Sequence, residues 1–431
     1  MRQLYIVFAC VLGICYLAQL AGPLRLDGDS PTYLCDASDL ADGRGFRDDH
    51  LPRGYPHVLA TLDLMGLGSS AGFVAVNLVG MGMGLVCIST VLRRELELSR
   101  GEVEVICLLT CCSWVWVHLV AVPMSDLLFF ALSSMVLALL SLAKGCSRFR
   151  AVLSIGAAAL IAMAAFFVRT IGAALFVAVA FAVMDTDVVR RVFRRRLAIV
   201  LLTISVCVGG FVGLFYRDLL ASRYYSWALS YLLTPPPDVS EEGASSIHLL
   251  SVAWWRIGEV GAIAQNVSAA AFAPTAPTLP VDSLTLSILL MPELRGLRQA
   301  VGIVSVILIF AGLWSRRRRF SHVEAYLTAY VGILLIWPYE DTRFFAPVIP
   351  LLFAFAWLGL RSLNPQPRTL ARFMRIYVAA FCLFGAVAMG DSLRTAFFCP
   401  ERASRESWRY VGSLPAQQAA FDRYGGERPS R

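Results

Sequence analysis

The sequence predicts an all-α protein, a polytopic transmembrane helical bundle of about eleven spans. Of its 431 residues, 58% are hydrophobic and only 16% are charged, which is more apolar surface than one soluble core can hide. Apolar stretches of about 20 residues, the length that crosses a bilayer, follow one another with short polar turns between them. The arginines stand mostly at the ends of these stretches. Lipid is therefore the expected solvent.

The first apolar run is expected to stay as an anchor. Its Gly22-Pro23 exit and the lack of a small-residue cleavage site argue against a signal peptide. The predicted spans, in chain order, are 4–22, 73–92, 103–121, 124–143, 151–168, 170–185, 197–217, 298–315, 320–338, 344–361 and 374–390.

Basic residues on alternate connections set the predicted orientation. The basic connections are Arg93-Arg94, Lys144 to Arg150, Arg190 to Arg196, Arg316 to Arg319, and Arg361 to Arg375. Short basic loops stay in the cytoplasm, so the N-terminus is expected inside and the C-terminus on the external, periplasmic face of an inner membrane. The net charge of +8 is thus explained as a topology signal, and no nucleic-acid partner is expected.

The predicted organisation is a bundle over residues 1–390 and an external tail over 391–431. Within the bundle, residues 23–72 form a first external loop with an acidic motif, and residues 218–297 form a large external loop. Aromatic rings beside an arginine within 247–272 suit the headgroup layer, so an interfacial helix is expected there.

The first external loop carries the most informative motif. It runs Gly28-Asp29-Ser30-Pro31-Thr32-Tyr33-Leu34, followed by Gly43, Gly45-Phe46 and Pro52-Arg53-Gly54-Tyr55-Pro56. A carboxylate just outside the first span, with a tyrosine four positions on, suits a base at the mouth of a cavity. The later glycines and prolines shape a turn back to the membrane.

This loop resembles that of the GT-C fold membrane glycosyltransferases that use polyprenyl-phosphate sugars, related to protein O-mannosyltransferases and lipid A aminoarabinose transferase. Their Asp-Glu-x-x-Tyr motif is matched with Ser30 in place of Glu. Looser matches follow at Pro123 to Leu128, with Asp126 for the usual Glu, at Val168-Arg169, and at Arg343 to Pro347. The resemblance implies a GT-C-like fold and a glycosyltransferase, with membrane lipids, a polyprenyl-phosphate sugar donor, and a lipid, glycan or protein acceptor as partners.

The resemblance also implies roles for individual residues. Asp29 would be the general base that takes a proton from the acceptor hydroxyl, in a displacement that inverts the sugar carbon. Asp126 would be a second catalytic carboxylate. The remaining expected substrate-binding residues are aromatic or basic: Tyr33, Tyr55, Arg53, Arg169 and Arg343. The arginines would hold the departing phosphate, so Asp29 is expected to face Arg343 at the rim of an intramembrane groove.

Simpler explanations stand beside these roles. Asp126 begins a span, where a helix N-terminus favours a carboxylate without any function. Arg169 and Arg343 suit interfacial anchors, Tyr33 suits plain packing, and His118 is expected to pack.

Cofactors and metals are not expected. No glycine-rich phosphate-cradling loop occurs, and a donor dissolved in the bilayer needs none. His50 and His57 beside Asp29 are more typical of solvated loop histidines than of ligands. No CxxC spacing occurs among the eleven cysteines, and a disulfide between the external Cys35 and Cys399 is left open.

Other functions remain as alternatives. A secondary transporter or flippase would place charges near the bilayer midplane, whereas here Asn77 is a rare polar residue inside a span. An O-antigen ligase-like enzyme would lack the early acidic motif. A non-catalytic membrane scaffold is the third alternative.

Overall fold

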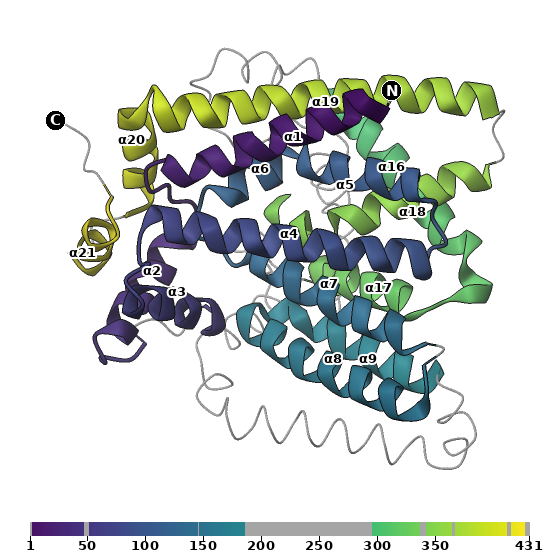
Figure 1. The fold of residues 1–431 in the computed structure, drawn as a ribbon, viewed down its shortest axis with the longest axis horizontal. Helices are drawn as coiled ribbons and strands as arrows, with labels where there is room; N and C mark the ends of the chain where they lie inside the picture. Colours follow the sequence, from purple (N-terminus) through teal and green to yellow (C-terminus); the bar gives the residue numbers. More distant parts are fainter. Residues whose placement is uncertain are drawn as a thin grey trace, which may run out of the picture.

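The computed structural model describes residues 2–46, 51–144, 146–185, 295–336, 342–363, 367–411 and 415–426. Over these residues the chain is helical and contains no strand, so the predicted all-α class is confirmed (Figure 1). The helices are α1 (Arg2–Ala18), η1 (Gln19–Ala21), α2 (Ser30–Ala41), α3 (Gly54–Leu64), α4 (Ser70–Arg94), α5 (Arg100–Cys111), α6 (Trp114–Val120), α7 (Asp126–Ala143), α8 (Arg148–Val168), η2 (Thr170–Gly172), α9 (Ala173–Asp185), α16 (Arg295–Ser315), η5 (Arg317–Arg319), α17 (His322–Ile336), η6 (Thr342–Val348), α18 (Ile349–Ser362), α19 (Pro367–Phe397), α20 (Pro400–Val411) and α21 (Pro415–Arg423).

Several helices have the length and composition of membrane spans. Among the described residues, five are long and apolar enough, and the pair α5 and α6 makes a sixth if it is counted as one span. Shorter apolar helices occupy Ile6–Ala21, Thr170–Met184 and Ala300–Ser315. The predicted span 197–217 and the predicted interfacial helix within 247–272 lie outside the described residues. The count of about eleven spans therefore stays a prediction.

The predicted span 103–121 is not one straight helix. The chain breaks into α5 and α6, which are bent by 61°. Hydrogen bonds from other helices satisfy the carbonyls that these ends release: Tyr16 Oη donates to Cys111 O at 2.6 Å, and Asn77 Nδ2 donates to Val122 O at 2.7 Å. Local hydropathy does not reveal the break, because those distant donors make it possible.

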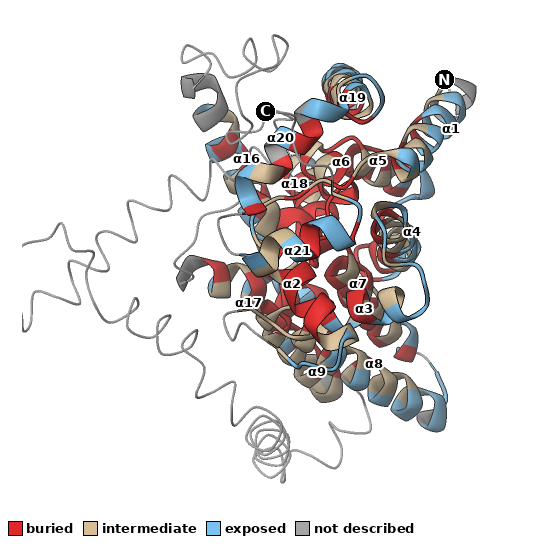
Figure 2. Cartoon of the chain, turned by 90° about the vertical axis from the view of Figure 1, so that its left-hand side faces the viewer, coloured by how far each residue is buried: buried red, intermediate tan, exposed pale blue. Residues whose placement is uncertain are grey.

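Close helix packing holds the centre of the bundle. The α16–α18 crossing depends on Gly312 and Gly359, since a Cβ on either residue would collide with a backbone carbonyl of the facing helix. The outward faces of α1, α4, α8 and α16 instead carry exposed apolar side chains, such as Ile14, Val79, Leu160 and Phe310 (Figure 2). Such faces suit lipid.

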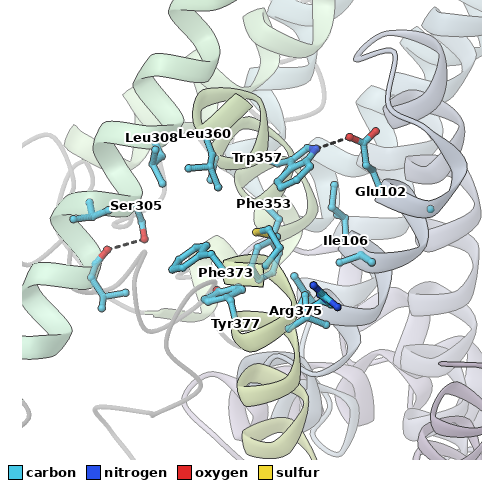
Figure 3. Close-up of a pocket in the computed structure, with 18 of the residues that line it drawn as sticks. Glu102, Ile106, Ser305, Leu308, Phe353, Trp357, Leu360, Phe373, Arg375 and Tyr377 are labelled. Carbon is cyan, nitrogen blue, oxygen red and sulfur yellow. Dashed lines mark hydrogen bonds between the residues drawn. The ribbon is translucent and has the colours of Figure 1, made fainter. Parts of the chain in front are cut away.

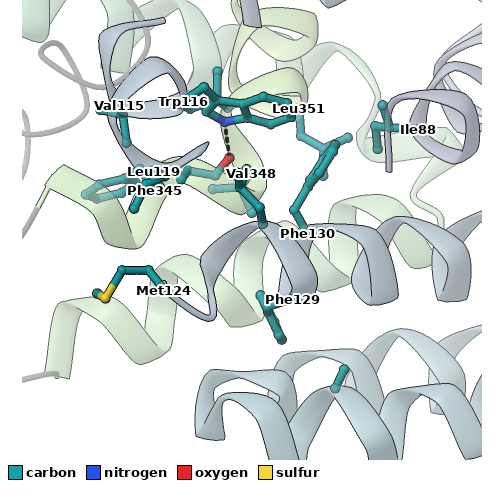
Figure 4. Close-up of a cluster of buried hydrophobic side chains, with 14 of the residues drawn as sticks. Ile88, Val115, Trp116, Leu119, Met124, Phe129, Phe130, Phe345, Val348 and Leu351 are labelled. Atoms are coloured by element: carbon teal, nitrogen blue, oxygen red, sulfur yellow. Dashed lines mark hydrogen bonds between the residues drawn. The ribbon is translucent and has the colours of Figure 1, made fainter. Parts of the chain in front are cut away.

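A buried cluster joins α6, α7, η6 and α18 (Figure 4). The indole of Trp116 lies edge-on to the ring of Phe130, with centroids 4.7 Å apart. Its Nε1 donates to Ala346 O at 3.1 Å, which satisfies a buried polar group on each side. This cluster fixes η6, the short turn that carries Arg343, against the rest of the bundle.

The first external loop and the C-terminal region pack on each other. Arg423 of α21 pairs with Asp42 at 2.9 Å and with Asp63 at 2.6 Å, so α21 bridges the ends of α2 and α3. α19 continues through Phe397, past the boundary predicted at residue 390. No disulfide joins Cys35 and Cys399 in the structure.

Candidate active site

Asp29 and Arg343 meet at one end of the bundle. Asp29 immediately precedes α2 and Arg343 lies in η6, and Arg343 Nη2 lies 2.8 Å from Asp29 Oδ2. The Asp29 side chain is 36% exposed and that of Arg343 is 13% exposed. The predicted pairing is present, and it places an accessible carboxylate against a largely buried cation.

The backbone before Asp29 makes this approach possible. Gly28 has φ +44°, a left-handed conformation that side chains disfavour. A Cβ at Gly28 would lie 2.9 Å from Arg343 Nη1, so the residue must be small for the guanidinium to reach Asp29. Asp29 then occupies the N-cap position of α2, and its side chain makes no capping hydrogen bond.

Hydrogen bonds from neighbouring helices hold the Arg343 turn. Tyr330 Oη donates to Phe344 O at 2.6 Å, beside the bond from Trp116 to the same turn. Arg343 Nη1 also contacts Met124 Sδ at 3.7 Å. The guanidinium is therefore positioned before any ligand arrives.

A second ion pair lies beside the first. Arg169, between α8 and η2, pairs with Asp126 at the start of α7, and its Nη1 lies 3.4 Å from Ser125 Oγ. The Asp126 side chain is 0% exposed and that of Arg169 is 14% exposed. Both Arg169 and Arg343 have their guanidinium carbons 5.4 Å from the centroid of the Phe344 ring. Two cations thus share one aromatic ring.

The burial of Asp126 differs from what a catalytic carboxylate needs. No acceptor can reach a side chain without exposed surface, so the position of Asp126 favours orienting Arg169 over the catalytic role predicted for it. The sequence could not reveal this, because exposure at a helix start depends on how the neighbouring helices pack.

The two predicted tyrosines are buried behind the pairs. Tyr33 Oη shares a hydrogen bond of 3.3 Å with Ser125 Oγ, and its ring lies edge-on to Tyr55 at 5.1 Å. Burial, together with the nearby charge of Asp29, raises the pKa of Tyr33 to about 12. Both tyrosines therefore pack behind the two ion pairs and present almost no surface to a substrate.

Arg53 stands at the start of α3. Its guanidinium carbon lies 4.8 Å from the centroid of the Phe46 ring. The next residue, Gly54, packs so closely on the backbone of Phe167 and Val168 that a Cβ would collide with it. α3 thus packs on the C-terminal end of α8, next to Arg169. His57 Nδ1 lies 2.8 Å from Arg53 O, while His50 lies outside the described residues.

A hydrogen bond between a histidine and a carboxylate was missed from the sequence. His118 Nε2 donates to Asp27 Oδ2 at 2.9 Å, and the imidazole stacks on Trp114 with centroids 5.3 Å apart. Burial alone would raise the pKa of Asp27, but the bond to His118 and the charges of His118 and Arg343 outweigh it and lower this pKa to about 2. The external end of span 103–121 was the available signal, since it places His118 on the side of the acidic loop.

The C-terminal helix α20 also reaches this loop. Ser407 Oγ accepts a hydrogen bond from Leu26 N at 3.1 Å and donates one to Leu24 O at 3.3 Å. Tyr410 hydrogen bonds to Asp27. The segment that leads to Asp29 is therefore fixed from both sides, by α6 and by α20.

An apolar groove lies in the other half of the bundle (Figure 3). Its volume is about 620 Å³, and α5, α16, α18 and α19 line it. Trp357 Nε1 donates to Glu102 Oε1 at 2.8 Å at one side. Its nearer wall, at Phe353, follows Arg343 by ten residues along η6 and α18, a path on the order of 15 Å. The lining does not include Asp29, so this groove is separate from the predicted rim.

No protein family and no curated protein matches the chain by sequence. The chain is similar in structure to ArnT. A crystal structure of ArnT from Cupriavidus metallidurans bound to undecaprenyl phosphate has a TM-score of 0.41 at 14% identity, and covers 98% of this chain and 75% of that one. The apo structure of the same protein has a TM-score of 0.39 at 16% identity, and covers 99% and 75%.

Proposed function

We propose that this protein is a membrane glycosyltransferase that moves a sugar from a polyprenyl-phosphate donor to an acceptor hydroxyl. The observation that carries the proposal is the Asp29–Arg343 pair of 2.8 Å at one end of an apolar helical bundle. It combines an accessible carboxylate, which can take a proton, with a positioned guanidinium, which can hold a phosphate. An acceptor at the external face of the inner membrane fits the predicted orientation.

The proposed reaction is a single displacement. The acceptor O–H gives its proton to the Asp29 carboxylate, and its oxygen forms a bond to the anomeric carbon. The bond from that carbon to the phosphate oxygen breaks, and its electron pair leaves with polyprenyl phosphate. Attack opposite the leaving group inverts the sugar carbon. These steps use no cofactor.

Arg343 has two functions in this scheme. Without donor it holds Asp29, and the phosphate of an arriving donor competes for the same guanidinium. As Arg343 turns toward the phosphate, the carboxylate is released to act as the base. Charge that develops on the leaving phosphate is then stabilised by Arg343 and by Arg169, which shares the Phe344 ring.

The other predicted residues position these two arginines and the base. Asp126 and Ser125 orient Arg169, while Tyr33 holds Ser125 through the hydrogen bond between their hydroxyl groups. Tyr55 packs on Tyr33, and Arg53, at the start of α3, packs its guanidinium on the Phe46 ring. Substitution of these residues is expected to disturb geometry more than chemistry.

The prenyl tail would extend away from Arg343 along α18 into the apolar groove between α5, α16, α18 and α19. That groove is lined almost entirely by apolar side chains, which suits a hydrocarbon chain and not a sugar. A bilayer-dissolved donor could enter it sideways from the membrane.

The test compares Asp29→Asn with Asp42→Asn. Asp42 is a matched control, because it also caps α2, pairs with arginine and is 33% exposed. Cell-envelope glycolipids, glycans and glycoproteins are compared by mass spectrometry with and without each variant. We expect Asp29→Asn to lose about 10²- to 10⁴-fold of the glycosylated product, and Asp42→Asn to keep it. Full product from Asp29→Asn, at equal membrane insertion, contradicts the proposal.

A further inference from the structure

A polar cavity lies at the end of the bundle opposite Asp29. α4 and α7 both begin near the Asp29 site and end at this cavity, whose volume is about 560 Å³ (Figure 1). The end of α4, the end of α7 and the turn between α16 and α17 supply its walls. The lining residues are Arg94, Glu95, Glu97, Ser141, Lys144, Arg316, Arg318, Arg319, Phe320 and Ser321.

Ion pairs with a buried carboxylate fix the walls of this cavity. Lys144 Nζ lies 2.7 Å from Glu95 Oε2, and Arg316 Nη2 donates to the Glu95 backbone oxygen at 2.6 Å. Arg316 also pairs with Glu324, whose side chain is 0% exposed and which accepts a bond from Ser321 N at 2.8 Å. Because each charge is held by another element, the three wall segments form one preorganised unit.

Two arginines remain after these pairs are assigned. Arg319 is paired with Glu97 at 3.1 Å, whereas Arg94 and Arg318 line the cavity without a carboxylate partner among the residues that the structure describes. Five basic side chains line the cavity against two carboxylates, so its potential is positive. A cavity of this kind is expected to attract an anion.

Two arginines that neighbour Arg94 and Arg318 in the sequence lie outside the cavity and serve as a comparison. Arg93 and Arg317 have the same charge in the same two segments, but neither lines the cavity. Arg317 lies over the ring of Trp314 at 4.7 Å, and Trp314 is 69% exposed on the apolar face of α16. A tryptophan there is typical of the headgroup layer, which places the cavity at the depth of lipid phosphates.

We propose that this cavity binds a phosphate group, supplied by an anionic membrane lipid or by a soluble phosphate compound. The basic loops needed for orientation explain why arginines occur at this end, but orientation does not require a cavity whose walls are joined by ion pairs. Arg94 and Arg318 would donate charge-assisted hydrogen bonds to the phosphate oxygens. The proposal is independent of the Asp29 reaction.

The experiment uses the full-length protein and two double variants. Arg94→Gln with Arg318→Gln removes the cavity arginines, while Arg93→Gln with Arg317→Gln removes the same charge from the same segments outside the cavity. The lipid arm measures retention of phosphatidylglycerol against phosphatidylcholine by native mass spectrometry. The soluble arm measures pyrophosphate binding by calorimetry in phosphatidylcholine nanodiscs.

The cavity variant is expected to bind about tenfold less in one arm, while the control variant binds as the unmodified protein does. A loss confined to phosphatidylglycerol identifies a lipid phosphate, and a loss confined to pyrophosphate identifies a soluble one. If the two double variants behave alike in both arms, the cavity is not a phosphate site.

Discussion

At the scale of single residues, the site depends on a contact between residues 314 positions apart in the chain. Gly28 allows Arg343 to approach, and the hydrogen bonds to η6 hold the guanidinium in place. Arg343 holds the Asp29 carboxylate in the structure, so the scheme requires that the donor phosphate compete for the same guanidinium.

The Asp27–His118 pair gives a residue-scale prediction. The pKa of Asp27 is lowered to about 2, below the value near 3.8 of an unfolded chain, so its stabilisation is present above pH 4. That stabilisation is lost as the pH falls toward 2. We expect Asp27→Asn to reduce the free energy of unfolding at neutral pH by on the order of 2 kcal/mol.

Melting temperatures in detergent between pH 7 and pH 3 check this prediction. The difference in melting temperature between the protein and Asp27→Asn should narrow as the pH falls below about 4. A difference that widens below pH 4 would show that the Asp27 carboxylate is not stabilised in its ionised form.

Site residues could be predicted from the sequence only where they belong to a recognisable motif. The resemblance around Asp29 and Arg343 indicated both members of the pair, since each belongs to a recognisable element. The burial of Asp126 was not predictable, because it depends on how helices far apart in the sequence pack. The position of His118 in its span indicated only its side of the membrane, not its contact with Asp27.

At the scale of elements, the positions of the spans were predictable from the sequence, whereas a break within a span was not. Hydropathy locates α4, α7, α8 and α19, because each is a long apolar run. The bend between α5 and α6 depends on donors in α1 and α4 that lie far away in sequence. The groove likewise depends on how α16 and α18 cross, at two glycines.

The groove gives an element-scale prediction. Val304 of α16 lines it and is 55% exposed, so Val304→Trp should fill the groove without straining the core. We expect KM for a donor with a long prenyl chain to rise about tenfold, because the tail loses buried apolar contact. A donor with a two-isoprene chain should be unaffected.

Ile303→Trp is the control for this experiment. Ile303 is 54% exposed on the same helix but is not part of the groove lining. Equal effects of the two substitutions, or equal effects on long and short donors, would mean that the prenyl tail lies elsewhere.

At the scale of the whole molecule, the two ends of the bundle differ in chemistry. One end carries Asp29 with α2, α3, α20 and α21, and the other carries the arginine turns and the polar cavity (Figure 1). The alternation of basic loops predicted this division. Asn77, the polar residue inside a span, is buried and donates hydrogen bonds to backbone oxygens at the end of α6.

The orientation gives a whole-molecule prediction. With the arginine turns in the cytoplasm, a C-terminal alkaline phosphatase fusion should be active, because that enzyme folds only outside the inner membrane. A C-terminal green fluorescent protein should be dark, and an N-terminal one should fluoresce. The reverse pattern would place Asp29 in the cytoplasm.

The most direct test of the central account is the affinity of the protein for undecaprenyl phosphate in nanodiscs. If Asp29 and the phosphate compete for Arg343, Asp29→Asn should bind undecaprenyl phosphate severalfold more tightly than the unmodified protein while transferring no sugar. Arg343→Gln should bind it about tenfold more weakly. Unchanged affinity in both variants would contradict the account, because neither side chain would then face the phosphate.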